Sequence, residues 1–120
     1  MIQQRAIADY LAGRALDPRP PAEGLRILVE DFYKHRYPQH THDLTTLGDI
    51  IQAAEAVAPT PLQALRHLLP ALKEFNVYAS RYHHSTQGYR ATPIIEDRLR
   101  HYCRGALSLV HDEGRSYPLA

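Results

Sequence analysis

Proline limits the length of the secondary-structure elements in this chain more strongly than any other residue. It lacks a backbone N–H and restrains the residue before it, so helices end near a proline or begin with one. Nine prolines occur in 120 residues, and the stretches between them are short enough to be single helices. Two prolines follow threonine, at Thr60-Pro61 and Thr92-Pro93. That pair is typical of a helix start, because threonine caps a helix and proline suits its first turn.

Apolar residues recur at helical spacing between these breaks. We expect helices over about residues 2–16 and 22–37, a third after Thr46, a fourth opening at Thr60 and a fifth opening at Thr92. Asp49, three residues after Thr46, predicts a cap with an acidic first turn. Pro70 predicts either a kink in the fourth helix or the start of another one. The third helix has the apolar face Leu47, Ile50, Ile51, Ala54 and Ala58, and the fifth has the stripe Ile95, Leu99, Tyr102, Cys103, Ala106, Leu107 and Val110.

No stretch alternates between apolar and polar residues for long enough to predict a strand. The sequence therefore predicts an all-α fold, a bundle of four to five helices with short connections. We expect residues 1–20 to form an N-terminal helix and a proline-rich linker, residues 21–114 the bundle, and residues 115–120 a tail. Whether the first helix joins the same core or forms an appended arm stays open.

Composition excludes several classes of function. The net charge of +1 makes no case for a nucleic-acid binder, and the single cysteine, Cys103, rules out an internal disulfide and a cysteine-rich zinc site. No apolar run reaches the roughly 20 residues of a membrane span, and the first residues lack the pattern of a signal peptide. No glycine-rich loop is present to cradle phosphates. We therefore expect a cytoplasmic protein without membrane contact, resident cofactor, metal or ATPase activity of its own.

The segment from Asn76 to His84 is the strongest candidate site. It continues a leucine stripe, so Asn76 and His83 should project towards the core, where unpartnered polar groups are costly. Arg26 and Glu30 lie four apart on the second helix and are the expected partners, with Tyr78 as a further member of the network. One interpretation is a polar network that sets how the helices pack.

A second interpretation of the same segment is catalytic. A histidine can take the proton from a ribose 2′-hydroxyl while a cation stabilises the charge on the phosphate, so His83, His84 and Arg81, assisted by Asn76, could cut RNA without a metal. Tyr78 or Tyr82 could stack on a base. Adjacent residues on a helix point about 100° apart, so both histidines can face one site only where the helix ends. The loop around Gly88 makes such an ending plausible.

A smaller histidine cluster, His40-Thr41-His42, falls in an expected loop beside Asp43. Its spacing does not place both rings on one helical face, although a loop could still bring them to a metal. The alternative is a solvated linker, which we favour.

The order of several segments resembles a known family. These are residues 25–38, the segment Leu47-Gly48-Asp49-Ile50-Ile51, the run Asn76-Val77-Tyr78-Ala79-Ser80-Arg81-Tyr82-His83-His84, and a last helix with Tyr102-Cys103. Together they look like the C-terminal helical part of large AAA ATPases of the anticodon-nuclease and RecF/SMC-like type, bacterial proteins often associated with anti-phage defence. The arrangement is more distantly similar to HEPN-type helical domains.

The resemblance implies a helical interaction module without ATPase activity, whose partner is another protein, a second copy of the chain or an ATPase. The alternative implied by the HEPN-type likeness is a small metal-independent ribonuclease that acts on RNA or tRNA. That family uses an arginine four to six residues before its histidine, whereas Arg81 precedes His83 and His84 by only two and three. The sequence therefore leaves open whether the protein is an enzyme.

Overall fold

The computed structural model describes residues 2–56 and 59–118, and within them every regular element is helical. The α-helices are α1 (Ile2–Leu11), α2 (Arg19–Arg36), α3 (Pro38–Thr41), α4 (Leu47–Glu55), α5 (Leu69–Ser80) and α6 (Glu96–His111). Two 3₁₀ helices, η1 (Pro61–Leu68) and η2 (Tyr89–Ala91), complete the described elements. The predicted all-α class is confirmed. The described residues contain six α-helices rather than four or five, because residues 38–41 form a short extra helix. The expected fourth helix is divided near Pro70 into the 3₁₀ helix η1 and the α-helix α5, which begins at Leu69.

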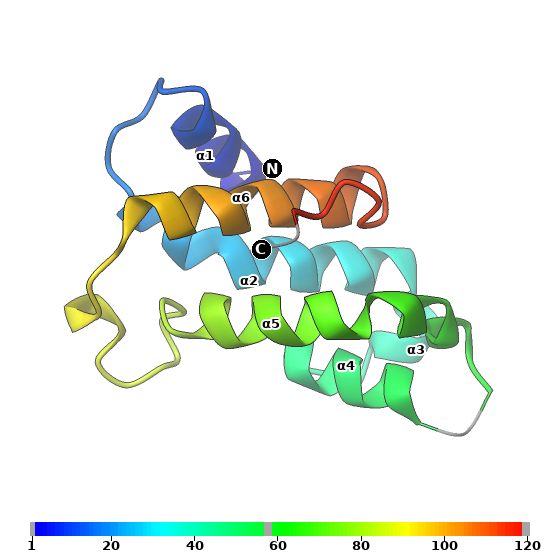
Figure 1. The fold of residues 1–120 in the computed structure, drawn as a ribbon. Helices are drawn as coiled ribbons and strands as arrows, with labels where there is room; N and C mark the ends of the chain where they lie inside the picture. Colours follow the sequence, from blue (N-terminus) through cyan, green and yellow to red (C-terminus); the bar gives the residue numbers. More distant parts are fainter. Residues whose placement is uncertain (1, 57–58, 119–120) are drawn as a thin grey trace.

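Helix α2 is the centre of the bundle and contacts every other described α-helix. Figure 1 shows α6 and α1 on one side of α2, with α5, α4 and α3 on the other. The fully buried side chains come from all of the longer elements, including Ile7, Leu25, Leu47, Phe75 and Leu99. Burying such side chains is the main source of stability in a domain of this size.

The first helix belongs to this core. Ile7 is fully buried and Tyr10 nearly so, and α1 contacts both α2 and α6. The Tyr10 hydroxyl also donates a hydrogen bond of 2.7 Å to Glu96. Helix α1 ends at Leu11 rather than near residue 16, because Gly13, at φ +75°, ends it. The N–H groups of Gly13 and Arg14 bond back to Tyr10 and Asp9, which is the Schellman pattern.

The proline-rich stretch is part of a helix rather than wholly a linker. Helix α2 begins at Arg19, so Pro20 and Pro21 occupy its first turn, where their missing N–H groups leave no bond unmade. The α4 cap is as predicted: the Thr46 side chain accepts from the Asp49 N–H, and the Asp49 side chain accepts from the Thr46 N–H. Those bonds hold the pKa of Asp49 below its usual value, with the Thr45 and Thr46 backbone N–H groups contributing most. Ala58, expected on the same helix face, lies outside the described residues.

The predicted start of the last helix was wrong. Helix α6 begins at Glu96, and the Thr92 hydroxyl donates to the Gly88 carbonyl instead of capping it. Ile95 therefore precedes the helix and is 63% exposed, although the other positions of the stripe contribute to the core or pack on it. Of the predicted tail, residues 115–118 are described, and Tyr117 packs closely over Gly105 of α6.

Candidate functional site

The candidate segment lies where α5 ends. The helix stops at Ser80, and residues 81–88 form turns, so His83 and His84 both follow the helix. Their side chains have different surroundings: His83 is 7% exposed, whereas His84 is exposed and its ring lies 4.2 Å from the His83 ring. The end of α5 thus meets the condition under which the two histidines could lie together.

Arg26 of α2 is the hub of a polar cluster at this position. Its Nη1 donates to Ser80 Oγ at 3.2 Å, and its Nη2 donates to His83 Nδ1 at 3.0 Å and to Ser85 Oγ at 3.3 Å. Ser80 Oγ in turn donates to Asn76 Oδ1 at 3.2 Å. The cluster of Arg26, Asn76, Ser80, His83 and Ser85 therefore joins the middle of α2 to the end of α5 and the turn that follows.

Glu30 extends this cluster to α4. Its Oε2 atom lies 3.0 Å from Arg26 Nε, as an ion pair rather than an aligned hydrogen bond, and both side chains are about nine-tenths buried. The same oxygen accepts a bond of 2.6 Å from the Leu47 N–H. Leu47 is the first residue of α4, where backbone N–H groups have no partner within the helix. Glu30 therefore stabilises the start of α4 and neutralises Arg26 at the same time.

The bonds to His83 determine its protonation state. Arg26 Nη2 and the Ser85 backbone N–H can only donate, and both point at His83 Nδ1. Nδ1 must therefore carry a lone pair, which makes the ring neutral with its proton on Nε2. Burial, then the Arg26 charge and His84, lowers the pKa of His83 to about 4. His83 is a neutral, weakly basic group at physiological pH.

Three of the expected site residues lie outside this cluster. Tyr78 is buried, and its ring is stacked on Tyr102 with the ring centres 4.0 Å apart. Its hydroxyl makes no well-aligned hydrogen bond. Burial, and to a lesser extent the nearby Tyr82, raises the pKa of Tyr78. Arg81 is exposed, with its guanidinium 5.8 Å from the centre of the Tyr78 ring. His84 contacts the cluster only through the ring of His83. Since Tyr78 and Tyr82 are at least 97% buried, neither ring is free to stack on a base.

Ser80 and Ser85 were not anticipated as members of the cluster. Ser80 lies four residues after Asn76, so helical spacing alone could have indicated that pair. Ser85 has no such signal, because it reaches Arg26 and His83 through the turn after α5, and that turn has no regular period.

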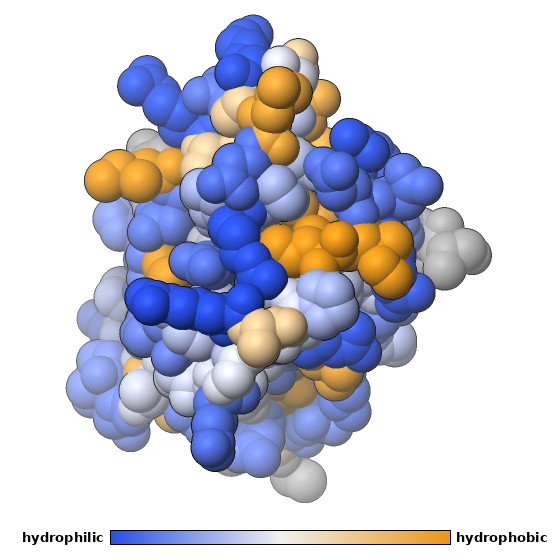
Figure 2. Space-filling view, turned by 90° about the vertical axis from the view of Figure 1, so that its left-hand side faces the viewer, coloured by the Kyte–Doolittle hydropathy of each residue, from blue (hydrophilic) through white to orange (hydrophobic). Residues whose placement is uncertain are grey.

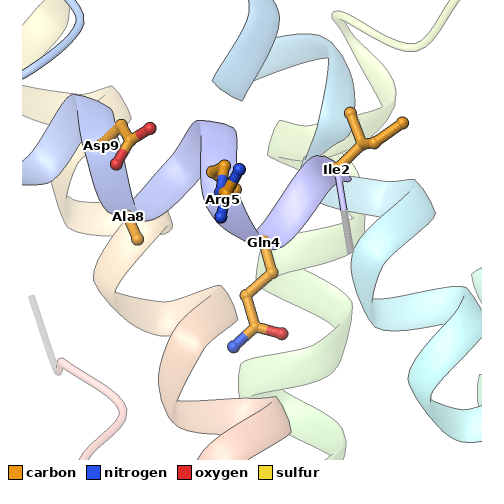
Figure 3. A pocket seen from close by; sticks show the side chains of 5 residues that line it. All are labelled: Ile2, Gln4, Arg5, Ala8 and Asp9. Atoms are coloured by element: carbon orange, nitrogen blue, oxygen red, sulfur yellow. The ribbon is translucent and has the colours of Figure 1, made fainter.

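A hollow beside α1 does not gather chemical groups in the same way. This hollow, of about 640 Å³, lies against α1, and its lining side chains all belong to that helix. Figure 3 shows that they do not converge, since Asp9 and Ile2 point to one side and Gln4 and Ala8 to the other. No three histidine, cysteine, aspartate or glutamate side chains within the described ranges are grouped to hold a metal. His40 lies in α3 and His42 follows it, with His42 Nδ1 3.2 Å from the Gln39 carbonyl oxygen.

None of the helices in residues 2–56 and 59–118 combines the length and the apolar character needed to cross a membrane. In comparisons with known proteins, no protein-family model, curated protein or solved structure matches this chain. The fold class and the Arg26-centred cluster are therefore the observations from which a function can be inferred.

Proposed function

We propose that this chain is a helical binding module, which acts through contacts with another protein or a second copy of itself and has no catalytic activity. The observation that carries the proposal is the state of His83. The best-placed histidine of the candidate segment is buried and accepts bonds from two groups that can only donate. A general base needs a free lone pair near its substrate and a pKa near the working pH. The Nδ1 lone pair of His83 is already occupied by donors, and the pKa of the ring is about 4.

The rest of the polar cluster supports the same proposal. Arg26, Glu30 and Asn76 are bonded to the helices around them, and Glu30 caps α4. A buried network of charged and hydrogen-bonding groups such as this one fixes how helices pack, and a buried member that loses its partner would destabilise the fold. This structural role accounts for Asn76 and His83, two of the residues that suggested ribonuclease chemistry.

Exposed aliphatic side chains offer surface for protein contacts. Val77 and Ile95 are each 63% exposed, and Ile2 and Leu16 are more than 80% exposed. Figure 2 shows one face of the molecule that is mostly hydrophilic, with one larger hydrophobic patch near its middle and smaller ones nearer its edge. The resemblance to the C-terminal region of defence-associated AAA ATPases supports an ATPase as the partner, since no phosphate-binding loop occurs in the sequence.

The proposal is tested by two measurements on the purified chain. Size-exclusion chromatography with light scattering, over a wide range of concentration, should detect a dimer, or a defined complex when a candidate ATPase is added. Val77→Asp and Ile95→Asp should weaken that assembly, whereas the exposed Arg104→Gln should not. A strict monomer that binds no ATPase partner would remove the proposal.

The second measurement addresses the alternative, a HEPN-like ribonuclease. The wild-type chain is incubated with total tRNA and with a structured RNA in EDTA, beside His84→Ala and His83→Gln variants. Glutamine retains an acceptor for Arg26, and His84 is exposed, so both variants should fold. We expect no cleavage by any of them. Cleavage by the wild type that either variant abolishes would establish the ribonuclease instead.

A further inference from the structure

A small cavity lies at the end of α5, away from the Arg26 cluster. It is lined in part by Tyr78 and Arg81, two expected site residues that lie outside that cluster. Its volume is about 200 Å³, and it opens between the end of α5, the 92–95 connection and the start of α6. Seven residues line it: the edges of the largely buried Tyr78 and Tyr82, the connection residues Thr92, Pro93 and Ile95, and the cations Arg81 and Arg98. The cavity therefore combines an aromatic wall, an apolar wall and two cations.

Arginine supplies all of the formal charge on the lining residues. Arg81 and Arg98 are both exposed, and neither side chain makes an ion pair or hydrogen bond with the described residues. The two nearest acidic residues in sequence, Glu96 and Asp97, face Arg100 instead. None of the residues that line this cavity is acidic, and Arg98 also borders a neighbouring hollow together with Glu74 and Asp97. Guanidinium groups match the geometry of phosphate and carboxylate oxygens, which they bind through paired N–H donors.

The start of α6 adds to this field. Ile95 is the N-cap residue and supplies no side-chain cap, so the first N–H groups of this 16-residue helix have no side-chain acceptor there. Those groups and the helix dipole favour an anion at the N-terminal end, and the carboxylates of Glu96 and Asp97 in the first turn meet part of that preference. Arg98 lies in this first turn, and Ile95 and Arg98 both line the cavity, so the arginines and the helix end act at one place.

The cavity walls are held in place without a ligand. Arg19 of α2 donates to the carbonyl groups of Tyr89 and Thr92, and the Tyr82 hydroxyl donates to the Pro93 carbonyl at 3.1 Å. The Tyr78 ring is stacked on Tyr102 and lies beneath Arg81. Because these contacts order the connection before binding, a ligand would not have to supply the free energy to do so.

We infer that this cavity binds an anionic group, phosphate or carboxylate, carried on a small apolar or aromatic body. The anion lies between Arg81 and Arg98, and the apolar body lies against Pro93 and Ile95. The cavity is smaller than the roughly 300–1,000 Å³ typical of sites for drug-sized ligands, so the ligand is closer to one substituted ring than to a nucleotide. This inference does not depend on the proposed protein contacts.

The test uses four small probes with the purified chain: inorganic phosphate, phenyl phosphate, benzoate and the neutral benzyl alcohol. Binding is measured by titration calorimetry and by changes in the NMR amide signals of residues 92–98. We expect phenyl phosphate or benzoate to bind more tightly than inorganic phosphate, and benzyl alcohol not to bind. The tighter of the two aromatic anions identifies the group as a phosphate or a carboxylate.

Three variants decide the site. Arg81→Gln and Arg98→Gln should each weaken binding about tenfold or more, the usual effect of losing one hydrogen bond to a charged group. Arg104→Gln changes the net charge equally from an exposed position of α6 that does not line the cavity, and should leave binding unchanged. No binding by either aromatic anion would overturn the inference. So would binding that Arg81→Gln and Arg98→Gln leave intact, or that Arg104→Gln weakens as much. None of these results depends on whether the chain is a monomer or a dimer, so they test the cavity separately from the proposed protein contacts.

Discussion

Replacing Glu30 with alanine should be among the most destabilising single changes in this protein. The carboxylate is paired with Arg26 at 3.0 Å and accepts from the Leu47 N–H at 2.6 Å, in a place where both charged side chains are about nine-tenths buried. Its loss leaves a buried guanidinium without a counter-charge and the first N–H of α4 without an acceptor. Both consequences act on the folded state alone.

The expected magnitude follows from those two consequences. Breaking a buried ion pair by removing one partner costs about 3–5 kcal/mol, and an unsatisfied buried donor costs about 1–3 kcal/mol. One carboxylate serves both contacts, so the two do not simply add, and we expect a loss of about 3–5 kcal/mol. The free energy of unfolding of a typical domain is only about 5–15 kcal/mol.

Urea unfolding followed by far-UV circular dichroism measures this loss. With a slope of about 1–3 kcal/mol per molar urea, the midpoint should fall by about 1–5 M without a change in slope. Glu30→Gln keeps an oxygen for the Leu47 N–H and should cost less. Arg26→Met combined with Glu30→Leu removes both charges and should also cost less than Glu30→Ala alone.

Two results would refute this reasoning. If Glu30→Ala lies within about 0.5 kcal/mol of the wild type, the typical range for surface substitutions, the cluster does not support the fold. If the double replacement costs as much as the sum of its single changes, Arg26 and Glu30 act independently and the ion pair has no energetic role.

Two further predictions concern buried groups that titrate. The pKa of His83 is about 4 in the folded chain against about 6.5 when unfolded, so the unfolded state binds its proton first as the pH falls. The stability that neutral His83 contributes is complete above about pH 6.5 and is lost progressively towards pH 4. The urea midpoints at pH 7 and pH 5 should therefore differ more for the wild type than for His83→Gln. Equal differences would contradict the lowered pKa of His83. Burial raises the pKa of the Cys103 thiol to about 12, so a thiol reagent should not modify the native chain and should modify it fully in urea; rapid modification of the native chain would show that Cys103 is accessible.

Much of the helical framework could be predicted from local pattern. The Thr46–Asp49 cap appears in the structure, and so does most of the leucine stripe, with Leu62, Leu65 and Leu72 buried and its continuation reaching His83. Leu69, expected on the same face, is only half-buried, because residues 61–68 form a 3₁₀ helix that buries Leu68 instead. These features depend on residues three or four apart, which lie on one helical face whatever the remainder of the fold does. Helix ends were less predictable, because Thr92-Pro93 has the pattern of a cap and yet α6 begins three residues after Pro93.

The sequence by itself determined that this protein is all-helical and that the polar side chain of His83 would enter its core, whereas Asn76, expected there too, is half-buried. It could indicate Arg26 and Glu30 as partners, since they lie beside an apolar stripe. Only the tertiary structure decided that Glu30 also caps α4, that Ser85 completes the cluster, and that Arg81 points to a separate cavity with Arg98. Those contacts join residues 17 to 59 positions apart. They depend on how the helices cross and where each one ends, which no local period encodes.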